Sequence, residues 1–189
     1  HQLAAAEKWL NQALSEAKKR HIEVERARTL SNLGLVYRDK KNYAKAEELL
    51  KEAVTINEKL LGKYAVCTGV VLDNLGELYE DEGKLDQAEL VLKRALEIAE
   101  SHGADNPHTA VVLNNLGAFY HAHEKPENAE RYFLRAITEY NKNRPDDPQV
   151  VQIMEVVLTR YKESHRYPEF RKVFMQLINH KLGNDKDRL

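Results

Sequence analysis

One short phrase, Asn-Leu-Gly-x-x-Tyr, occurs three times in this chain at an almost constant spacing. Its glycines are Gly34, Gly76 and Gly117, so the copies lie 42 and then 41 residues apart. A second shared phrase follows each copy at the same offset, with alanines at positions 46 and 53, 88 and 95, and 129 and 136. A fixed period of this size is typical of a solenoid, in which each repeat buries its apolar face only by stacking on its neighbours.

Each repeat is predicted to contain two antiparallel helices. In the second copy, apolar residues recur at helical spacing in two stretches, first Leu72, Leu75 and Tyr79, and then Leu85, Ala88, Val91, Leu92 and Ala95. Gly83 stands between the stretches and can adopt the left-handed conformation that ends a helix. The small residues Gly76 and Ala88 predict a close approach of the two helices of one repeat, and we expect Tyr79 and Leu92 to fill the space between repeats.

The period divides the chain into unequal parts. The alanine phrase also occurs forty residues before its first full copy, at Ala6 and Ala13, with no first helix ahead of it. Near the other end, Leu158 and Phe170 replace the glycine and the first alanine, as is typical of a capping repeat. We therefore expect an all-α chain of about nine helices, divided into the second helix of an incomplete repeat (1–22), three full repeats (23–62, 63–104 and 105–145), a degenerate C-terminal capping repeat (146–182) and a disordered tail (183–189).

Composition excludes several classes of protein. Lys and Arg number 29 against 30 Asp and Glu, and a net charge of −1 does not suit a general binder of nucleic acid or anionic membranes. The sequence contains no stretch apolar enough to insert into a membrane, and its single cysteine, Cys67, fits a reducing compartment. These features predict a soluble intracellular protein of unknown compartment. Because the chain begins at His1 without a methionine, we expect a truncated or processed N-terminus.

The phrase Leu-Gly-x-x-Tyr followed by spaced alanines resembles the tetratricopeptide repeat, whose usual period is about 34 residues. The longer period here is similar to that of the repeats of kinesin light chains, as are the strings Leu61-Gly62-Lys63, Gly103-Ala104-Asp105-Asn106-Pro107-His108 and Leu113-Asn114-Asn115-Leu116-Gly117. The resemblance implies a right-handed superhelix of helix pairs. It also implies a concave surface, lined by the first helices, that holds a peptide or a segment of a partner protein.

Helical geometry indicates which residues would line that surface. At 100° per residue, the side of each first helix opposite its core face carries Arg28, Ser31, Asn32, Leu35, Arg38, Val70, Asp73, Asn74, Glu77, Asp81, Val111, Asn114, Asn115 and His121. The degenerate repeat would add Gln152, Glu155, Thr159 and Lys162. Some tetratricopeptide domains bind a C-terminal carboxylate with Lys and Asn at set positions. The equivalent positions here hold Ser31, Leu35, Asp73, Glu77, Asn114 and Ala118, which does not favour such a clamp.

Two groups among these residues have alternative interpretations. Asn32, Asn74 and Asn115 occupy equivalent positions and could form a ladder of amides that pairs with the backbone of an extended peptide, or they could bond neighbouring helices instead. Asp73, Glu77 and Asp81 could select a segment of basic or mixed charge, or they could simply face water.

The sequence contains no arrangement that predicts catalysis. It has no Gly-rich phosphate loop, no metalloprotease motif and no nucleophile elbow. His121 and His123 lie about 200° apart around a helix, so they are not expected to share a metal ion. Cys67 is expected to be a small packing residue rather than a nucleophile. We therefore predict a chain that is not an enzyme and that needs no cofactor and no metal.

The leading hypothesis is a scaffold or adaptor module that binds a peptide segment of a partner protein in its groove. A first alternative is a structural assembly subunit that docks through its ends and self-associates, using the opening helix with Leu3, Trp9 and Leu10. A second alternative is the peptide-sensing regulatory domain of a larger protein. In none of the three is a nucleic acid or a membrane the expected partner.

Overall fold

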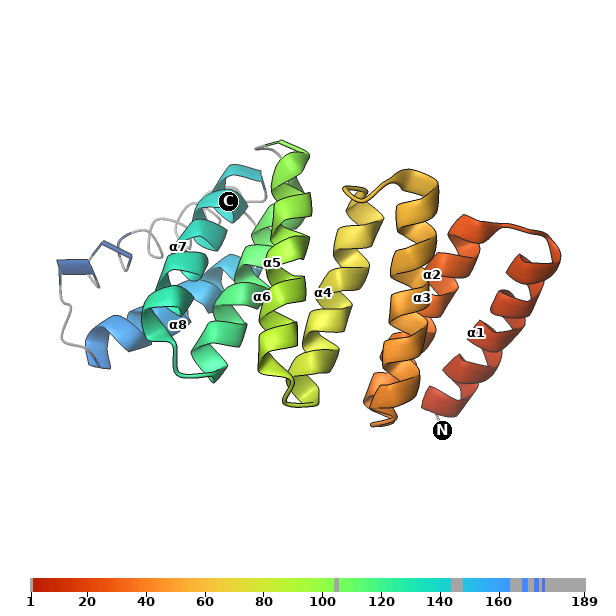
Figure 1. The fold of residues 1–189 in the computed structure, drawn as a ribbon. Helices are drawn as coiled ribbons and strands as arrows, with labels where there is room; N and C mark the ends of the chain where they lie inside the picture. The colour runs from red at the N-terminus through yellow and green to blue at the C-terminus, as the bar shows by residue number, and fades with distance from the viewer. Residues whose placement is uncertain are drawn as a thin grey trace, which may run out of the picture. The chain divides into compact units, whose positions relative to one another are not determined.

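The computed structural model describes residues 2–103, 106–143 and 148–163, together with positions 168, 169, 172, 173 and 175. The described part contains eight helices and no strand, which confirms the all-α prediction (Figure 1). The helices are α1 (Gln2–Lys19), α2 (Glu23–Asp39), α3 (Tyr43–Leu61), α4 (Val66–Asp81), α5 (Leu85–Ser101), α6 (Pro107–Ala122), α7 (Pro126–Asn143) and α8 (Pro148–Glu163). Most of the segment expected to form a ninth helix, and the whole of the tail 183–189, lie outside the described residues.

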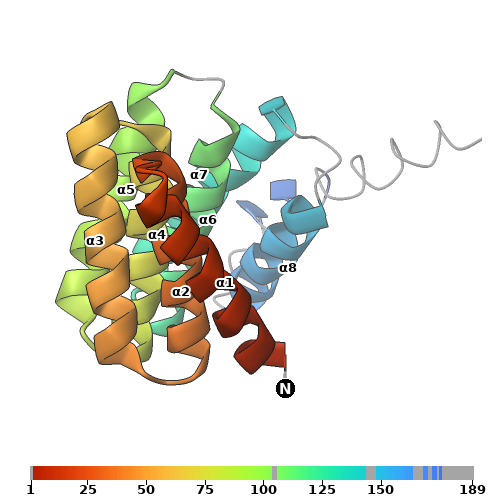
Figure 2. The same ribbon diagram turned by 90° about the vertical axis from the view of Figure 1, so that its right-hand side faces the viewer.

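The chain forms two compact units, His1–His102 and Gly103–Leu189. In the first unit, α2 packs most extensively on α3 and α4 on α5, while α3 also contacts α4 and α2 contacts α4. Seen along the row of helices, α3 and α5 lie on one side, with α2 and α4 beside them (Figure 2). In the second unit, α6 packs on α7 and α7 on α8. No described helix combines the length and the apolar composition needed to cross a lipid bilayer.

Glycine allows the two helices of each hairpin to approach closely. A Cβ atom added at Gly76 would lie 2.6 Å from the Leu92 side chain, and one added at Gly34 would lie 2.7 Å from Leu50. The equivalent distance from Gly117 to the Phe133 ring is 2.5 Å. The predicted close approach is therefore confirmed. Leu92, which was expected to fill the space between repeats, also lies against Gly76 inside its own hairpin.

The six alanines of the second phrase form the rest of the close contact. Those at positions 46, 53, 88, 95, 129 and 136 are all fully buried. A larger side chain at any of these positions would overlap a neighbouring helix, because protein interiors are packed without spare volume. The periodic small residues therefore set how near the helices of each unit lie.

The turns inside the hairpins share one backbone conformation. Gly83 has a φ of 73°, as predicted for the residue that ends α4. The turn between α2 and α3 uses Lys41 with a φ of 59°, and the turn between α6 and α7 uses Glu124 with a φ of 54°. A left-handed conformation is uncommon for residues other than glycine, so these two positions carry local strain.

Candidate functional site

The α2 helix carries the first group of predicted groove residues, between two pockets of the first unit. The α1/α2 pocket, of about 520 Å³, lies between α1 and α2 and includes Leu10, Glu16, Arg20 and Glu25. The α2/α4 pocket, of about 240 Å³, lies between α2 and α4. Arg28 and Asn32 line both pockets. Both are exposed, and together they form the ridge that separates the two pockets.

The α2/α4 pocket has an apolar side and a polar side. The apolar side consists of Val24, Cys67, Val70 and Val71. Val24 and Val70 are 52% and 40% exposed, so this apolar surface is open to solvent. The polar side consists of Arg28, Ser31, Asn32, Asn57 and Asn74. Such a mixture of apolar walls with a few polar groups is usual for a site that binds a ligand or a side chain.

The three equivalent asparagines lie in different environments. Asn74 is half-buried and its amide nitrogen donates to the Ser31 hydroxyl at 3.2 Å, so it bonds a neighbouring helix. This is the second of the two interpretations open for the asparagines. Asn32 is exposed on the ridge, whereas Asn115 is half-buried on α6 of the second unit.

The acidic residues expected in the groove are less available than the sequence predicts. Arg38 forms an ion pair with Glu77 and lies 3.4 Å from the Asp81 carboxylate. Partial burial alone would lower the pKa of Arg38, but the hydrogen bond to Glu77 and the charges of both carboxylates raise it above its ordinary value. Asp73 is buried, with only 6% of its surface exposed. A helical wheel considers one helix at a time, so it cannot show that other parts of the fold cover this face of α4.

The remaining positions of the first unit differ in exposure. Leu35 is half-buried on α2, and Ser31 is buried although it lines the α2/α4 pocket. Arg28 is exposed and forms an ion pair with Glu25 one turn earlier on the same helix. The predicted groove positions of this unit therefore combine one open amide, two paired guanidinium groups and an apolar wall.

In the second unit, a pocket of about 240 Å³ lies between α6 and α8. It is lined by Asn114, Ala118, His121, Phe133, Gln152, Ile153 and Val156. His121 is exposed, and its ring centroid lies 6.4 Å from that of Phe133. Val111 is half-buried, and Glu155, Thr159 and Lys162 are exposed along α8. Within the described ranges, no three His, Cys, Asp or Glu side chains come together as metal ligands do.

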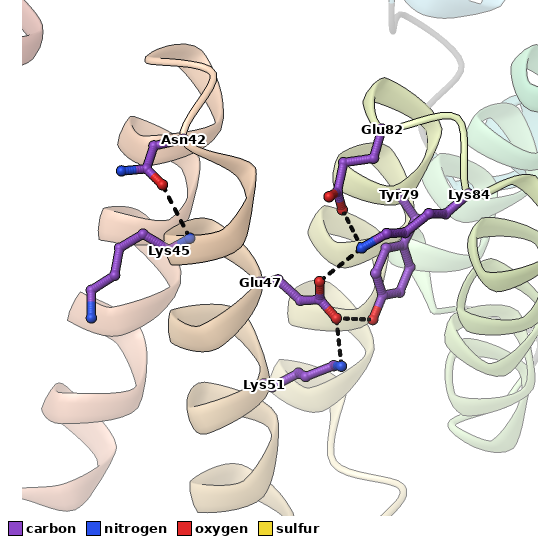
Figure 3. Close-up of polar contacts among 7 residues, drawn as sticks. All are labelled: Asn42, Lys45, Glu47, Lys51, Tyr79, Glu82 and Lys84. Atoms are coloured by element: carbon purple, nitrogen blue, oxygen red, sulfur yellow. Dashed lines mark hydrogen bonds and ion pairs between the residues drawn. The ribbon is translucent and has the colours of Figure 1, made fainter.

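A polar cluster joins the hairpin α2–α3 to the hairpin α4–α5, away from the pockets. The Glu47 carboxylate accepts hydrogen bonds from the Tyr79 hydroxyl at 3.0 Å, from Lys84 at 3.0 Å and from Lys51 at 2.5 Å (Figure 3). The hydrogen bond from Lys51, followed by those from Lys84 and Tyr79, lowers the pKa of Glu47 to about 2. Sequence analysis treated Tyr79 as an apolar filler and missed this cluster.

A second copy of this cluster shows what sequence signal could have revealed it. Glu7 accepts a hydrogen bond from the Tyr37 hydroxyl at 2.6 Å and forms an ion pair with Lys40. In both copies, the Glu follows the first alanine of the second-helix phrase, and the Tyr lies 30 to 32 residues later at the end of the repeated glycine phrase. The Glu–Tyr pair therefore recurs with the repeat, at a nearly constant spacing.

Asn57 is a buried polar residue of the α2/α4 pocket that was not among the predicted groove residues. It lies on α3, a second helix, whereas the predicted groove residues all lie on first helices. Its position is equivalent to Ala17, Ala99 and Tyr140 in the other second helices. The signal that could have found it is a polar amide at a place where two of the other three repeats have alanine.

Comparison with known proteins agrees with this architecture. A family model described as tetratricopeptide repeat matches residues 25–101 and 91–142. No curated protein sequence matches the chain. Among solved structures, BtubC (BKLC) from P. vanneervenii is similar with a TM-score of 0.83 at 20% identity, over 98% of this chain and 75% of that one.

Two further solved structures are similar. A putative kinesin light chain from Podosopora anserina with nearly identical TPR-like repeats has a TM-score of 0.72 at 18% identity, over 97% of this chain and 89% of that one. A Rap protein complexed with Competence and Sporulation Factor has a TM-score of 0.69 at 16% identity, over 98% of this chain and 60% of that one. At such low identity these likenesses show the fold alone. The family match spans more than half of the 189 residues, and on that ground the chain belongs to the tetratricopeptide-repeat family.

Proposed function

We propose that this chain is a non-catalytic protein-interaction module that holds a segment of a partner protein across α2 and α4 of the first unit. The observation that carries the proposal is the ridge of Arg28 and Asn32, which borders an open pocket on each side. A segment lying over this ridge could place one side chain in each pocket. The exposed Asn32 amide could meanwhile donate a hydrogen bond to the backbone of the segment and accept one from it, whatever the sequence of the segment.

The charges of the first unit favour a partner segment of mixed charge. The α1/α2 pocket contains two carboxylates, Glu16 and Glu25, and two guanidinium groups, Arg20 and Arg28. Glu16 pairs with Arg20 and Glu25 with Arg28, but all four side chains are at least 44% exposed, whereas the Arg38 side chain that faces Glu77 and Asp81 is only 22% exposed. Complementary charges at the rim of a site mainly govern specificity and the rate of association. We therefore expect recognition to depend on the α1/α2 pocket for charge and on the α2/α4 pocket for apolar contact.

A charged substitution in the apolar wall tests the proposal. Val70→Lys should reduce partner capture at least about tenfold, because it places an ammonium group where a partner would exclude water. Leu90→Lys is the matched control, since Leu90 is 70% exposed on α5 and lines none of the pockets described above. Proteins captured by the wild type and by both variants would be quantified by mass spectrometry. Equal capture by the wild type and Val70→Lys would overturn the proposal.

The exposed face of α1 favours a second candidate, a subunit that self-associates through its end. Trp9 is 71% exposed, whereas Leu49 and Tyr132 at the equivalent positions of α3 and α7 are 5% and 6% exposed. The first helix of the same hairpin, α2 or α6, packs on α3 or α7. The same face of α1 has no such helix among the described residues, so it could receive one from a second copy.

The oligomeric state distinguishes the two candidates. Self-association predicts a molecular mass that rises with protein concentration in light scattering, together with a blue shift in the fluorescence of Trp9, the only tryptophan of the chain. Trp9→Glu should abolish the rise in mass, whereas the blue shift can be followed only in the wild type because the variant has no tryptophan. A constant monomer mass up to high concentration would exclude this candidate and leave the peptide-binding proposal unaffected.

A further inference from the structure

We propose that the α2/α4 pocket is a specificity pocket for one neutral hydrogen-bonding side chain, Ser, Thr, Asn or Gln, and that the Asn57 amide is the group that recognises it. This inference rests on the proposed function, because it concerns the segment held across α2 and α4.

Asn57 combines burial with unused hydrogen-bonding capacity. Its surface is only 4% exposed, yet it lines the α2/α4 pocket. Among the described residues, its side chain has no hydrogen-bond partner. Its side-chain oxygen and nitrogen are not among the buried polar atoms that lack a partner, so solvent reaches them through the pocket. In the free protein, only water that enters through the pocket can satisfy the Asn57 amide.

The position of Asn57 in the repeat indicates that folding does not require an amide there. The equivalent residues are Ala17, Ala99 and Tyr140, and both Ala17 and Ala99 are buried. A small apolar residue therefore packs well at this place in the hairpin. The amide is a departure from the repeat at the point where a pocket opens, as expected of a residue kept for binding rather than for packing.

The other groups of the pocket explain why the side chain should be neutral. Ser31 and Asn74 are bonded to each other, and Arg28 is paired with Glu25. A carboxylate or an ammonium group entering beside Asn57 would lose its hydration without gaining an unpaired countercharge. A hydroxyl or carboxamide group can both donate to and accept from the amide.

The size and walls of the pocket also limit the side chain. Its volume of about 240 Å³ accommodates one side chain of moderate length. Val24, Val70 and Val71 form its apolar wall, so the methyl or methylene groups of Thr or Gln would find apolar contact there. A side chain with an apolar stem and a neutral polar end therefore matches both the wall and the amide.

The test uses the full chain and a displayed library of random twelve-residue peptides. Peptides would be selected on the wild type, on Asn57→Leu and on Asn57→Ala, the second variant serving in case leucine is too large. Asn11→Ala is the matched control, because Asn11 is an exposed amide of α1 outside the α2/α4 pocket. We expect one peptide position to favour Ser, Thr, Asn or Gln with the wild type and Asn11→Ala. Both variants at Asn57 should lose that preference.

A paired substitution then measures the contact itself. In the best selected peptide, the preferred residue would be replaced by its apolar isostere, for example Thr by Val. The affinity for the wild type should fall about tenfold, and the affinity for Asn57→Leu should change little, because the partner amide is already absent. Equal losses with both proteins would show that Asn57 does not contact this residue.

The outcomes separate this inference from the proposed function. If peptides bind and Val70→Lys weakens them, but no position prefers a neutral polar residue, the role of Asn57 is wrong and the proposed function stands. A preference for acidic, basic or purely apolar residues that depends on Asn57 would overturn the chemical class. If no selected peptide is sensitive to Val70→Lys, both the proposed function and this inference fail.

Discussion

Replacing Glu47 by Gln should destabilise the first unit by an amount that depends on pH. Glu47 belongs to α3 of one hairpin, and it accepts hydrogen bonds from Tyr79 and Lys84 of the next hairpin. In a helical-repeat array, stability is the sum of the repeats and of the interfaces between them. Glu47→Gln keeps the shape of the side chain but removes the charge, so it isolates the electrostatic part of this interface.

The pKa of Glu47 gives the magnitude. The change from the ordinary value of 4.5 to about 2 corresponds to about 3 kcal/mol of preference for the charged form. The side chains of Lys51 and Lys84 are 58% and 39% exposed, so solvent screening reduces the expected loss in unfolding free energy at pH 7 to about 1–2 kcal/mol.

The sign of the pH dependence follows from the lowered pKa. The unfolded chain takes up a proton at Glu47 near pH 4.5, whereas the folded chain does so only near pH 2. The stabilisation by the carboxylate is therefore complete above about pH 5 and is lost as the pH falls through this interval. The difference between the wild type and Glu47→Gln should shrink to less than half of its neutral value by about pH 3.

The assay is urea unfolding followed by circular dichroism at pH 7, 5, 4 and 3. Glu48→Gln is the matched control, because Glu48 is the next residue of α3, is 61% exposed and, among the described residues, pairs only with Lys45 one turn away. Such an exposed pair contributes about 0.5 kcal/mol or less. The reasoning is refuted if Glu47→Gln costs no more than Glu48→Gln at pH 7, or if its cost is the same at pH 7 and pH 3.

Three further substitutions test the packing, the turns and the α2/α4 pocket. Gly76→Ala places a Cβ 2.6 Å from its nearest neighbour and should cost about 1–3 kcal/mol of unfolding free energy in urea. Gly69→Ala is the control, because it lies on the same helix, gains the same helix propensity and places its Cβ 3.2 Å from the nearest neighbour. It should cost less unfolding free energy, and equal costs would contradict the close approach at Gly76. Lys41→Gly relieves a φ of 59° and should stabilise the fold by about 1 kcal/mol, whereas Lys40→Gly, at a φ of −78°, should give no gain. Asn57→Leu should not lower the melting temperature, because the Asn57 side chain has no hydrogen-bond partner among the described residues, and a marked decrease would show that the amide is structural.

The sequence predicts packing well where the same residues recur. Gly34, Gly76 and Gly117 lie where each hairpin is tightest, and the recurring alanines are fully buried. Each of these positions is explained by a contact inside one hairpin, and such contacts depend on short spacings along the chain. Because glycine occurs at the same place in three repeats, it can be identified as a packing residue rather than as a glycine without a structural role.

Contacts between successive hairpins were less accessible to sequence analysis. Two contacts join α4 to α2, the hydrogen bond from Asn74 to Ser31 and the ion pair from Arg38 to Glu77. The partners in these contacts are 43 and 39 residues apart in the sequence. Their formation depends on how far one hairpin is shifted along the next, which the spacing of residues along the chain does not fix. The position of Asp73 inside the fold depends on neighbouring helices for the same reason.

Differences between repeats therefore indicate recognition more directly than their similarities do. The positions equivalent to Arg28 hold Val70 and Val111, and those equivalent to Ser31 hold Asp73 and Asn114. The side predicted to line the groove therefore changes from repeat to repeat, while the packing glycines and alanines are constant. If these positions were needed only for folding, any polar residue that tolerates solvent would serve there. In the first unit, the changing positions instead lie around the α2/α4 pocket, where they bring valines and amides together. In a fold whose packing residues simply recur, such local departures are where a binding preference can be built without loss of the array.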